Sequence, residues 1–112
     1  MTDQHDILYS LMGMCQQAGT LISGSAQVEA AIKNRKAELI VIATDIGDSM
    51  LKKFSDKAAF YEVATVRFGT KDLIGQSIGK GSRSAVAITD KGFARSFLEK
   101  HQTQHPGVNN IG

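Results

Sequence analysis

The fold of this chain is decided by two apolar stretches, Leu21-Ile22-Ser23-Gly24-Ser25-Ala26-Gln27 and Leu39-Ile40-Val41-Ile42-Ala43-Thr44-Asp45. The first is a short strand that turns at Gly24 directly into a helix, and the first N–H groups of a helix have no internal partner and favour an anion. The second is typical of a central strand. A basic cluster lies between them: Lys33, Arg35 and Lys36. This order predicts a small α/β domain that offers a helix N-terminus and a basic loop to a polyanion.

The composition is that of a small globular domain. A chain of 112 residues with 42% hydrophobic residues can bury a core without a disulfide or a metal. The single cysteine, Cys15, excludes an internal disulfide and fits a reducing compartment. The polar, acidic start is unlike a signal peptide, and no apolar run reaches the ~20 residues of a membrane helix. We therefore expect a soluble cytoplasmic monomer with no membrane contact.

Apolar residues alternate between helical and strand spacing along the chain. The spacing predicts strands at residues 21–22, 39–43, 63–68 and 84–89. It predicts a helix that ends at Gly19, a second capped by Ser23 or Ser25, a third after Asp48, a fourth capped by Thr70 and a fifth capped by Asp90. This alternation implies an α/β fold with helices on both faces of a central sheet.

The periodic pattern stops near residue 101. Residues 101–112 show no apolar repeat and contain Pro106 and Gly107. We expect residues 1–100 to form a single domain and residues 101–112 to form a flexible C-terminal tail.

No constellation in the sequence supports catalysis, a cofactor or a metal. Residues 75–82 resemble a phosphate-binding P-loop, but the spacing is one residue short and Gly81 follows the lysine. A glycine helix stop followed by a loop is the favoured interpretation. His101 and His105 have the spacing of metal ligands on a helix, yet no third ligand is near in sequence, so we expect surface tail residues.

Two further candidates have ordinary structural interpretations. Cys15 falls on the apolar face of the first helix, where a buried thiol is expected rather than a nucleophile. Asp45 and Asp48 follow the central strand and fit either a metal site or a helix cap.

An ordered series of motifs resembles a known family. It consists of Leu11-Met12-Gly13-Met14-Cys15-Gln16-Gln17-Ala18-Gly19, Leu21-Ile22-Ser23-Gly24, residues 39–45, Leu51-Lys52-Lys53-Phe54 and Ala87-Ile88-Thr89-Asp90-Lys91-Gly92-Phe93-Ala94. Over residues 6–100 the chain resembles the bacterial YlxQ-type proteins. These belong to the kink-turn RNA-binding ribosomal-protein superfamily, which includes archaeal and eukaryotic large-subunit proteins.

The resemblance implies a three-layer α-β-α sandwich with a mixed four-stranded sheet. It also implies that the N-terminus of the second helix enters the groove of a kink-turn RNA while the loop before the last strand covers a flipped-out base. The matching positions here are Gly24, Ser25, Ala26 and Gln27 at the helix start, and Lys80, Gly81, Ser82 and Arg83 in the loop.

The chain departs from the family pattern at the positions that read bases. Ala26-Gln27 stands where relatives usually have Asn-Glu, and Ala30 stands where many have lysine. The covering loop, usually apolar, is polar here. A lost bidentate contact removes about 1–3 kcal/mol of base discrimination. We therefore expect altered kink-turn preference, with binding carried more by contacts to phosphates from Lys33, Arg35, Lys36, Lys80 and Arg83.

These patterns predict a non-catalytic, ribosome-associated RNA-binding protein. The expected contact residues are Gly24, Ser25, Gln27, Lys33, Arg35, Lys36, Lys80, Ser82 and Arg83. The alternative is a protein-interaction module that keeps the fold without specific RNA binding, which Ala26 and Ala30 allow. A substrate-recognition domain related to those of RNA methyltransferases is a third hypothesis, but 112 residues without a cofactor motif could not methylate alone.

Overall fold

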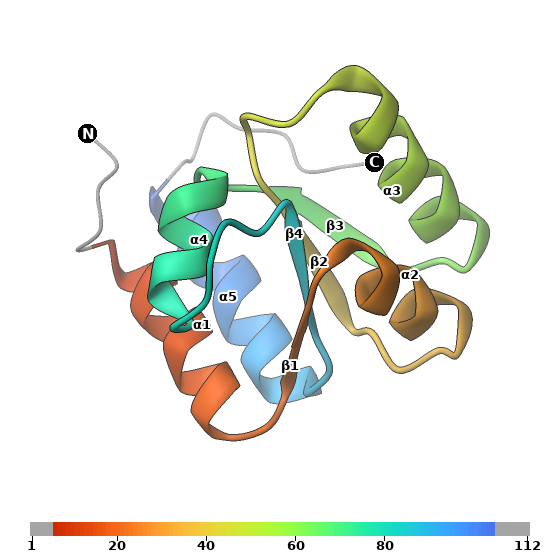
Figure 1. Cartoon of the computed structure of the whole chain (residues 1–112). Helices are drawn as coiled ribbons and strands as arrows, with labels where there is room; N and C mark the ends of the chain where they lie inside the picture. The colour runs from red at the N-terminus through yellow and green to blue at the C-terminus, as the bar shows by residue number, and fades with distance from the viewer. Residues whose placement is uncertain (1–5, 105–112) are drawn as a thin grey trace.

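The computed structural model describes residues 6–104, which form five helices around one four-stranded sheet (Figure 1). The helices are α1 (Ile7–Gln17), α2 (Ser25–Lys33), α3 (Asp48–Phe60), α4 (Lys71–Ser77) and α5 (Lys91–Gln104). The strands are β1 (Leu21–Ser23), β2 (Leu39–Ile42), β3 (Ala64–Arg67) and β4 (Ala85–Ile88). The elements follow the order that the sequence predicts, with ends that shift by a few residues.

The sheet is mixed and has the strand order β1-β4-β2-β3. β4 runs antiparallel to both of its neighbours, pairing Val86 with Ser23 of β1 and with Val41 of β2. β2 and β3 are parallel. β1, β2 and β3 therefore all run in one direction, and α2, α3 and α4, which follow them, all begin at the same edge of the sheet. β4 starts at that edge too.

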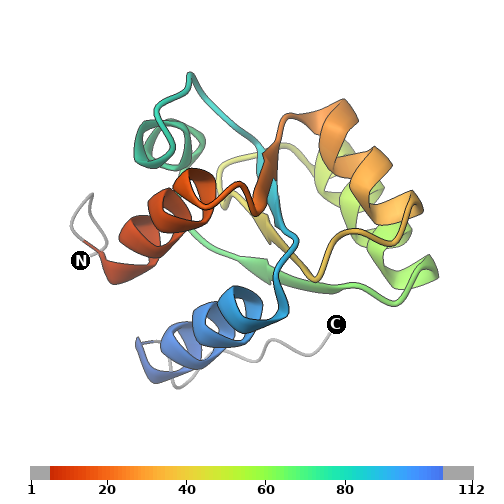
Figure 2. The ribbon, with the colours of Figure 1, turned by 90° about the horizontal axis from the view of Figure 1, so that it is seen from below.

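Each face of the sheet is covered by helices, as the sequence predicts. Figure 2 shows α2 and α3 on one side of the sheet and α1, α4 and α5 on the other. Side chains of β2 alternate between the two cores: Leu39 and Val41 pack with α1, α4 and α5, and Ile40 and Ile42 pack with α2 and α3. β2 and β4 are buried along their whole length, which confirms the three-layer α-β-α sandwich.

Four of the helices end in the same hydrogen-bonded turn. In each, the residue after the C-cap has a positive φ, and the next N–H bonds back to a carbonyl five residues earlier. Glycine takes the positive-φ position after α1 (Gly19) and α4 (Gly79), but Arg35 takes it after α2 and Glu62 after α3. A non-glycine residue in this conformation carries strain of roughly 1–2 kcal/mol.

The end of α5 corrects the expectation for His101. The helix continues to Gln104, and His101, expected as a surface tail residue, is only 2% exposed. Its ring lies edge-on to Phe68, with 6.3 Å between the ring centroids. His101 is one turn beyond Phe97, on the same buried face of the helix as Ala94. Residues 105–112, including His105, lie outside the described residues, and their assignment to a flexible tail stays a prediction.

Close packing around α4 depends on two glycines. A Cβ at Gly13 of α1 would lie 2.9 Å from the Ser77 carbonyl oxygen, and one at Gly75 would overlap the Gly81 carbonyl. The chain folds back over α4 here, because the Lys80 N–H donates to the Gly75 carbonyl at 2.8 Å. Residues 75–82 thus run from a helix into a loop, which confirms the helix-stop interpretation over a P-loop.

Replacing Gly75 with alanine should lower the free energy of unfolding by about 1–3 kcal/mol, because the added methyl group meets backbone rather than a movable side chain. Gly81→Ala is the matched control, since a Cβ there has open space and should change stability by less than about 0.5 kcal/mol. Urea denaturation of both variants measures the difference. Equal stabilities would show that α4 and the loop are not in close contact.

Cys15 is fully buried on the inner face of α1, as predicted. Burial raises the pKa of its thiol to about 11. Between pH 9 and 11 an unfolded chain loses this proton and the folded chain retains it. The folded state then binds more protons, so stability falls as the pH rises through this window.

The wild-type protein should therefore lose about 2–3 kcal/mol of unfolding free energy between pH 9 and 11 beyond any loss in Cys15→Ala. The alanine variant retains every other group that titrates in this range, including Tyr9, so the difference between the two profiles isolates the thiol. Denaturation at several pH values provides the measurement. Parallel profiles would mean that the thiol titrates equally in both states.

Candidate nucleic-acid interface

The start of α2 is an uncapped helix N-terminus. Gly24 holds φ 99°, and the Val28 N–H donates to its carbonyl at 2.8 Å as the first bond of the helix. No side chain caps α2, so the prediction of Ser23 or Ser25 as the cap is wrong. Ser23 is engaged in β1, and Ser25 already lies within the helix. Water or a ligand must therefore satisfy the first N–H groups of α2.

The Gln27 side chain lies over this helix start. A Cβ at Gly24 would be 2.5 Å from the Gln27 Oε1 atom, so the space left by the missing side chain is filled by the Gln27 amide. Gln27 is exposed and makes no ion pair or hydrogen bond with the rest of residues 6–104 through its side chain. An exposed amide of this kind can both donate and accept at a base edge.

The loop before β4 is held against α4. Ser82 Oγ donates to a carboxylate oxygen of Asp72, and the Arg83 N–H donates to the Lys71 carbonyl at 3.0 Å. Lys80 is exposed at the beginning of this loop. The loop therefore has a defined path along α4 before it enters the sheet (Figure 1).

Arg83 joins this loop to the end of β1. Its Nε donates to the Ser23 Oγ at 3.2 Å, and its Nη1 donates to the carbonyls of Gly81 and Ser82 at 3.3 and 3.0 Å. Ser23 directly precedes Gly24, so the guanidinium bridges two segments that lie 60 residues apart in sequence. This hydrogen bond joins the two segments that carry one group of predicted residues, which we call the α2 surface: Gly24, Ser25, Gln27, Lys80, Ser82 and Arg83.

The sequence analysis missed one cation at the same edge of the sheet. Arg67 ends β3 and donates to the carbonyls of Ala43 and Thr44 at 3.3 and 3.2 Å. Nearby, Asp45 accepts from the Lys71 N–H at 2.9 Å and so caps α4 rather than the helix that follows it in sequence. The only sequence signal for Arg67 is a basic residue at the end of a strand, which is common on solvated edges.

The remaining predicted residues lie at the other end of α2. Lys33 is the last residue of this nine-residue helix, and Arg35 and Lys36 follow it. A rise of 1.5 Å per residue puts Lys33 about 12 Å along the helix axis from Ser25. Lys33, Arg35 and Lys36 are exposed there, with the Arg35 guanidinium over the Tyr61 ring at 5.6 Å from its centroid.

Ion pairs join α2 to α3 between these two ends. Glu29 accepts from Lys53 at 2.9 Å and lies 3.7 Å from Lys57. The hydrogen bond from Lys53 lowers the pKa of the Glu29 carboxyl, and the charges of Lys53 and Lys57 add to this effect. Two of the cations on α3 are therefore already balanced by a carboxylate.

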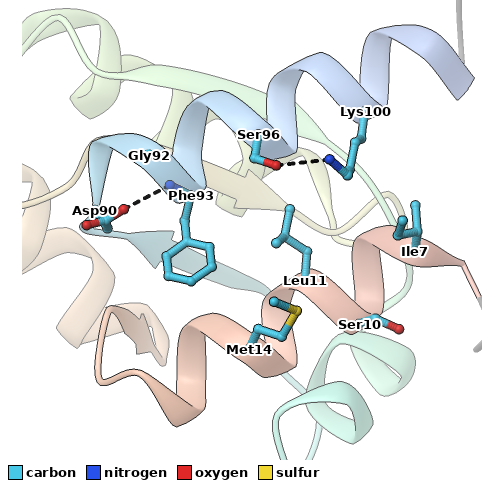
Figure 3. Close-up of a pocket in the computed structure, with 9 residues that line it drawn as sticks. All are labelled: Ile7, Ser10, Leu11, Met14, Asp90, Gly92, Phe93, Ser96 and Lys100. Carbon is cyan, nitrogen blue, oxygen red and sulfur yellow. Dashed lines mark hydrogen bonds between the residues drawn. The ribbon is translucent and has the colours of Figure 1, made fainter.

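A groove lies on the opposite side of the sheet, between α1 and α5 (Figure 3). It has a volume of about 540 Å³, and most of its lining is apolar. Ile7 and Met14 at its rim are 47% and 53% exposed. None of the residues predicted to contact RNA lines it.

The described part of the chain contains no group of three histidine, cysteine, aspartate or glutamate residues placed to hold a metal ion. None of the helices in residues 6–104 is long and apolar enough to cross a membrane. His5 lies outside the described residues.

Comparison with known families decides the identity of this fold. Residues 6–98 match the Ribosomal protein L7Ae/L30e/S12e/Gadd45 family. The chain belongs to this family. The match covers all four strands and all but the end of α5, so the resemblance predicted from the ordered motifs is confirmed.

Individual proteins that are similar to this L7Ae-family chain support the same family assignment. It is 33% identical over 90 residues to the RNA-binding protein YlxQ of Bacillus subtilis (strain 168), covering 80% of this chain and 90% of the relative. It is 37% identical over 90 residues to the RNA-binding protein YlxQ of Enterococcus faecium, covering 80% and 86%. A solved structure of a protein with unknown function from Bacillus halodurans C superposes with a TM-score of 0.79 at 30% identity, covering 83% and 94%.

Gly24→Ala should lower the free energy of unfolding by about 1–3 kcal/mol, because alanine is strained at φ 99° and its Cβ meets the Gln27 amide. Gly47→Ala is the matched control, since Gly47 is the N-cap of α3 with φ −74° and open space around it. That change should cost less than about 1 kcal/mol, the preference for glycine over alanine at a cap. Equal losses in thermal or urea denaturation would contradict a special conformation at Gly24.

Proposed function

We propose that this protein is a non-catalytic RNA-binding protein that recognises kinked or otherwise structured RNA through the α2 surface. One observation carries the proposal: the Arg83–Ser23 hydrogen bond joins the loop before β4 to the start of α2. These are the segments that the family resemblance assigns to RNA contact. The names of the YlxQ relatives support RNA as the ligand.

The α2 surface combines two kinds of RNA contact. The uncapped N–H groups after Gly24 favour a phosphate or a base oxygen, and the Gln27 amide can read a base edge. Lys80 and the outer nitrogen atoms of Arg83 supply positive charge for phosphates. This chain has alanine at position 26, where relatives usually have asparagine, so the Gln27 amide is the only side-chain amide in the first turn of α2 that can read a base edge.

Three further features belong to the same proposal. Ribosome association follows from the family rather than from any one residue. Action in the cytoplasm fits the composition and the single, reduced Cys15. The protein acts as a monomer in this proposal, because the first turn of α2 contacts RNA without a second copy of the chain.

A titration against a kink-turn RNA and a straight duplex of the same base composition, each at two salt concentrations, tests this function. The protein should prefer the kink-turn RNA, and the affinity for both should fall with salt. Gln27→Ala should reduce the preference by about 1–3 kcal/mol without changing the salt dependence, because it removes a base reader and no charge.

Lys80→Gln is the matched charge variant. It should weaken binding to both RNAs alike and reduce the slope of log affinity against log salt by about 0.9 for a duplex phosphate. Circular dichroism of both variants controls for folding. If neither change affects binding, RNA does not contact the α2 surface.

A protein-interaction module is the second candidate function. The apolar groove between α1 and α5 is the observation that favours it. Absence of binding to both RNAs at low salt would favour this function over the first.

A further inference from the structure

An exposed aromatic pair ends α3. Phe60 is 78% exposed, the highest value among the exposed large hydrophobic side chains of residues 6–104. Its ring meets the half-buried Tyr61 ring edge to face, with 4.9 Å between centroids and 78° between planes. Tyr61 packs against the core beneath α2 and α3, so it gives the Phe60 ring a fixed neighbour. An exposed phenylalanine at this position contributes little to the core.

One cation lies over this pair, and two more are close to that cation in sequence. The Arg35 guanidinium lies over the Tyr61 ring, and Lys33 and Lys36 flank Arg35 in sequence. Lys33 and Lys36 are exposed, and neither forms an ion pair within residues 6–104. We call these five residues the aromatic–basic cluster: Phe60, Tyr61, Lys33, Arg35 and Lys36. The neighbouring carboxylates in sequence are Glu38 and Glu62, so positive charge predominates.

The backbone conformation of Arg35 also supports a functional role for this cluster. The chain has glycine at the positive-φ position after α1 and α4, and Glu62 at this position after α3. After α2 it has Arg35 at φ 59°, which is strained but holds the guanidinium over Tyr61. Strained non-glycine residues gather at functional sites, because a side chain with a role is retained despite its cost.

We propose that the aromatic–basic cluster is a second RNA-contact site, which binds an unpaired segment of RNA by stacking a base on Phe60 and holding the adjacent phosphates with Lys33, Arg35 and Lys36. An aromatic face beside several cations is the combination that binds single strands, because every base can stack and every nucleotide carries a phosphate. The choice of RNA as the ligand rests on the proposed function. The site itself does not include any residue of the α2 surface.

The site is tested by titrating the full chain with a fluorescein-labelled ten-nucleotide oligouridylate. Phe60→Ala should weaken binding by about 5- to 150-fold and leave the salt slope unchanged, because it removes a stacking face and no charge. Met14→Ala is the matched control: Met14 is also an exposed apolar side chain, but it lies at the groove between α1 and α5, and its loss should not change affinity.

Phe60→Trp provides a direct readout of stacking. The chain contains no tryptophan, so this variant carries a single indole fluorophore. It should retain affinity for the oligouridylate, and its fluorescence should be quenched as the complex forms. Binding without quenching would overturn the stacking contact.

The cations are tested separately. Lys33→Gln with Lys36→Gln should reduce the salt slope by about 0.7 for each lost contact to a single-strand phosphate. Arg35→Gly should weaken binding without lowering the melting temperature, because glycine relieves the positive φ. A purely structural role for Arg35 predicts the reverse, a lower melting temperature with unchanged affinity.

A blunt-ended kink-turn RNA separates this site from the α2 surface. Phe60→Ala should leave its binding unchanged, and Gln27→Ala should leave oligouridylate binding unchanged. A protein that binds the kink-turn RNA but not the oligouridylate retains the proposed function and overturns the second site. A protein that binds only the oligouridylate supports the second site and overturns the proposed function of the α2 surface. Unchanged oligouridylate affinity in Phe60→Ala overturns the second site.

Discussion

The pairing of β4 between β1 and β2 is the constraint on which the rest of the structure depends. β4 and β2 are buried on both faces, and a slip of one residue would move each apolar side chain into the wrong core. Because β4 runs antiparallel to β1, it must start at the edge where β1 ends. The loop before β4 and the start of α2 therefore meet, and the contact between Arg83 and Ser23 is a consequence of strand direction.

Most of the fold could be predicted from the sequence, because both cores are aliphatic and their periodicity is clear. The runs at residues 39–43 and 85–88 identify the doubly covered strands, and the predicted caps Thr70 and Asp90 accept from Leu73 and Phe93. The prediction was wrong where the deciding contact is tertiary. His101 reads as polar, yet its aromatic ring fills a place beside Phe68. The predicted side-chain cap of α2 is absent because Gly24 takes the cap position, which leaves Ser23 in β1 and Ser25 inside the helix.

The candidate site was less predictable, because nearness in sequence and nearness in space differ. The residue types at Gly24, Gln27 and Lys80 indicated a ligand surface, but nothing local predicts that Arg83 reaches Ser23. Lys33, Arg35 and Lys36 are close to Gly24 in sequence and yet lie at or just beyond the far end of α2. Phe60 was not predicted as a contact residue, because a single apolar residue on the otherwise polar outer face of α3 does not indicate a site. Its proposed role depends on its contact with Tyr61 and on the position of Arg35 over Tyr61, which the sequence does not show.

The helix dipole gives a physical reason for two separate surfaces. A cation at the N-terminus of α2 is disfavoured by the positive end of the dipole, whereas cations at the C-terminus are stabilised. The first turn accordingly carries the uncharged Ser25, Ala26 and Gln27, and the basic residues gather at and beyond Lys33. Positive charge near the helix start must come from another segment, and Arg83 supplies it. The N-terminal end of α2 thus depends for positive charge on a loop that the sheet places beside it, whereas the C-terminal end carries its own cations.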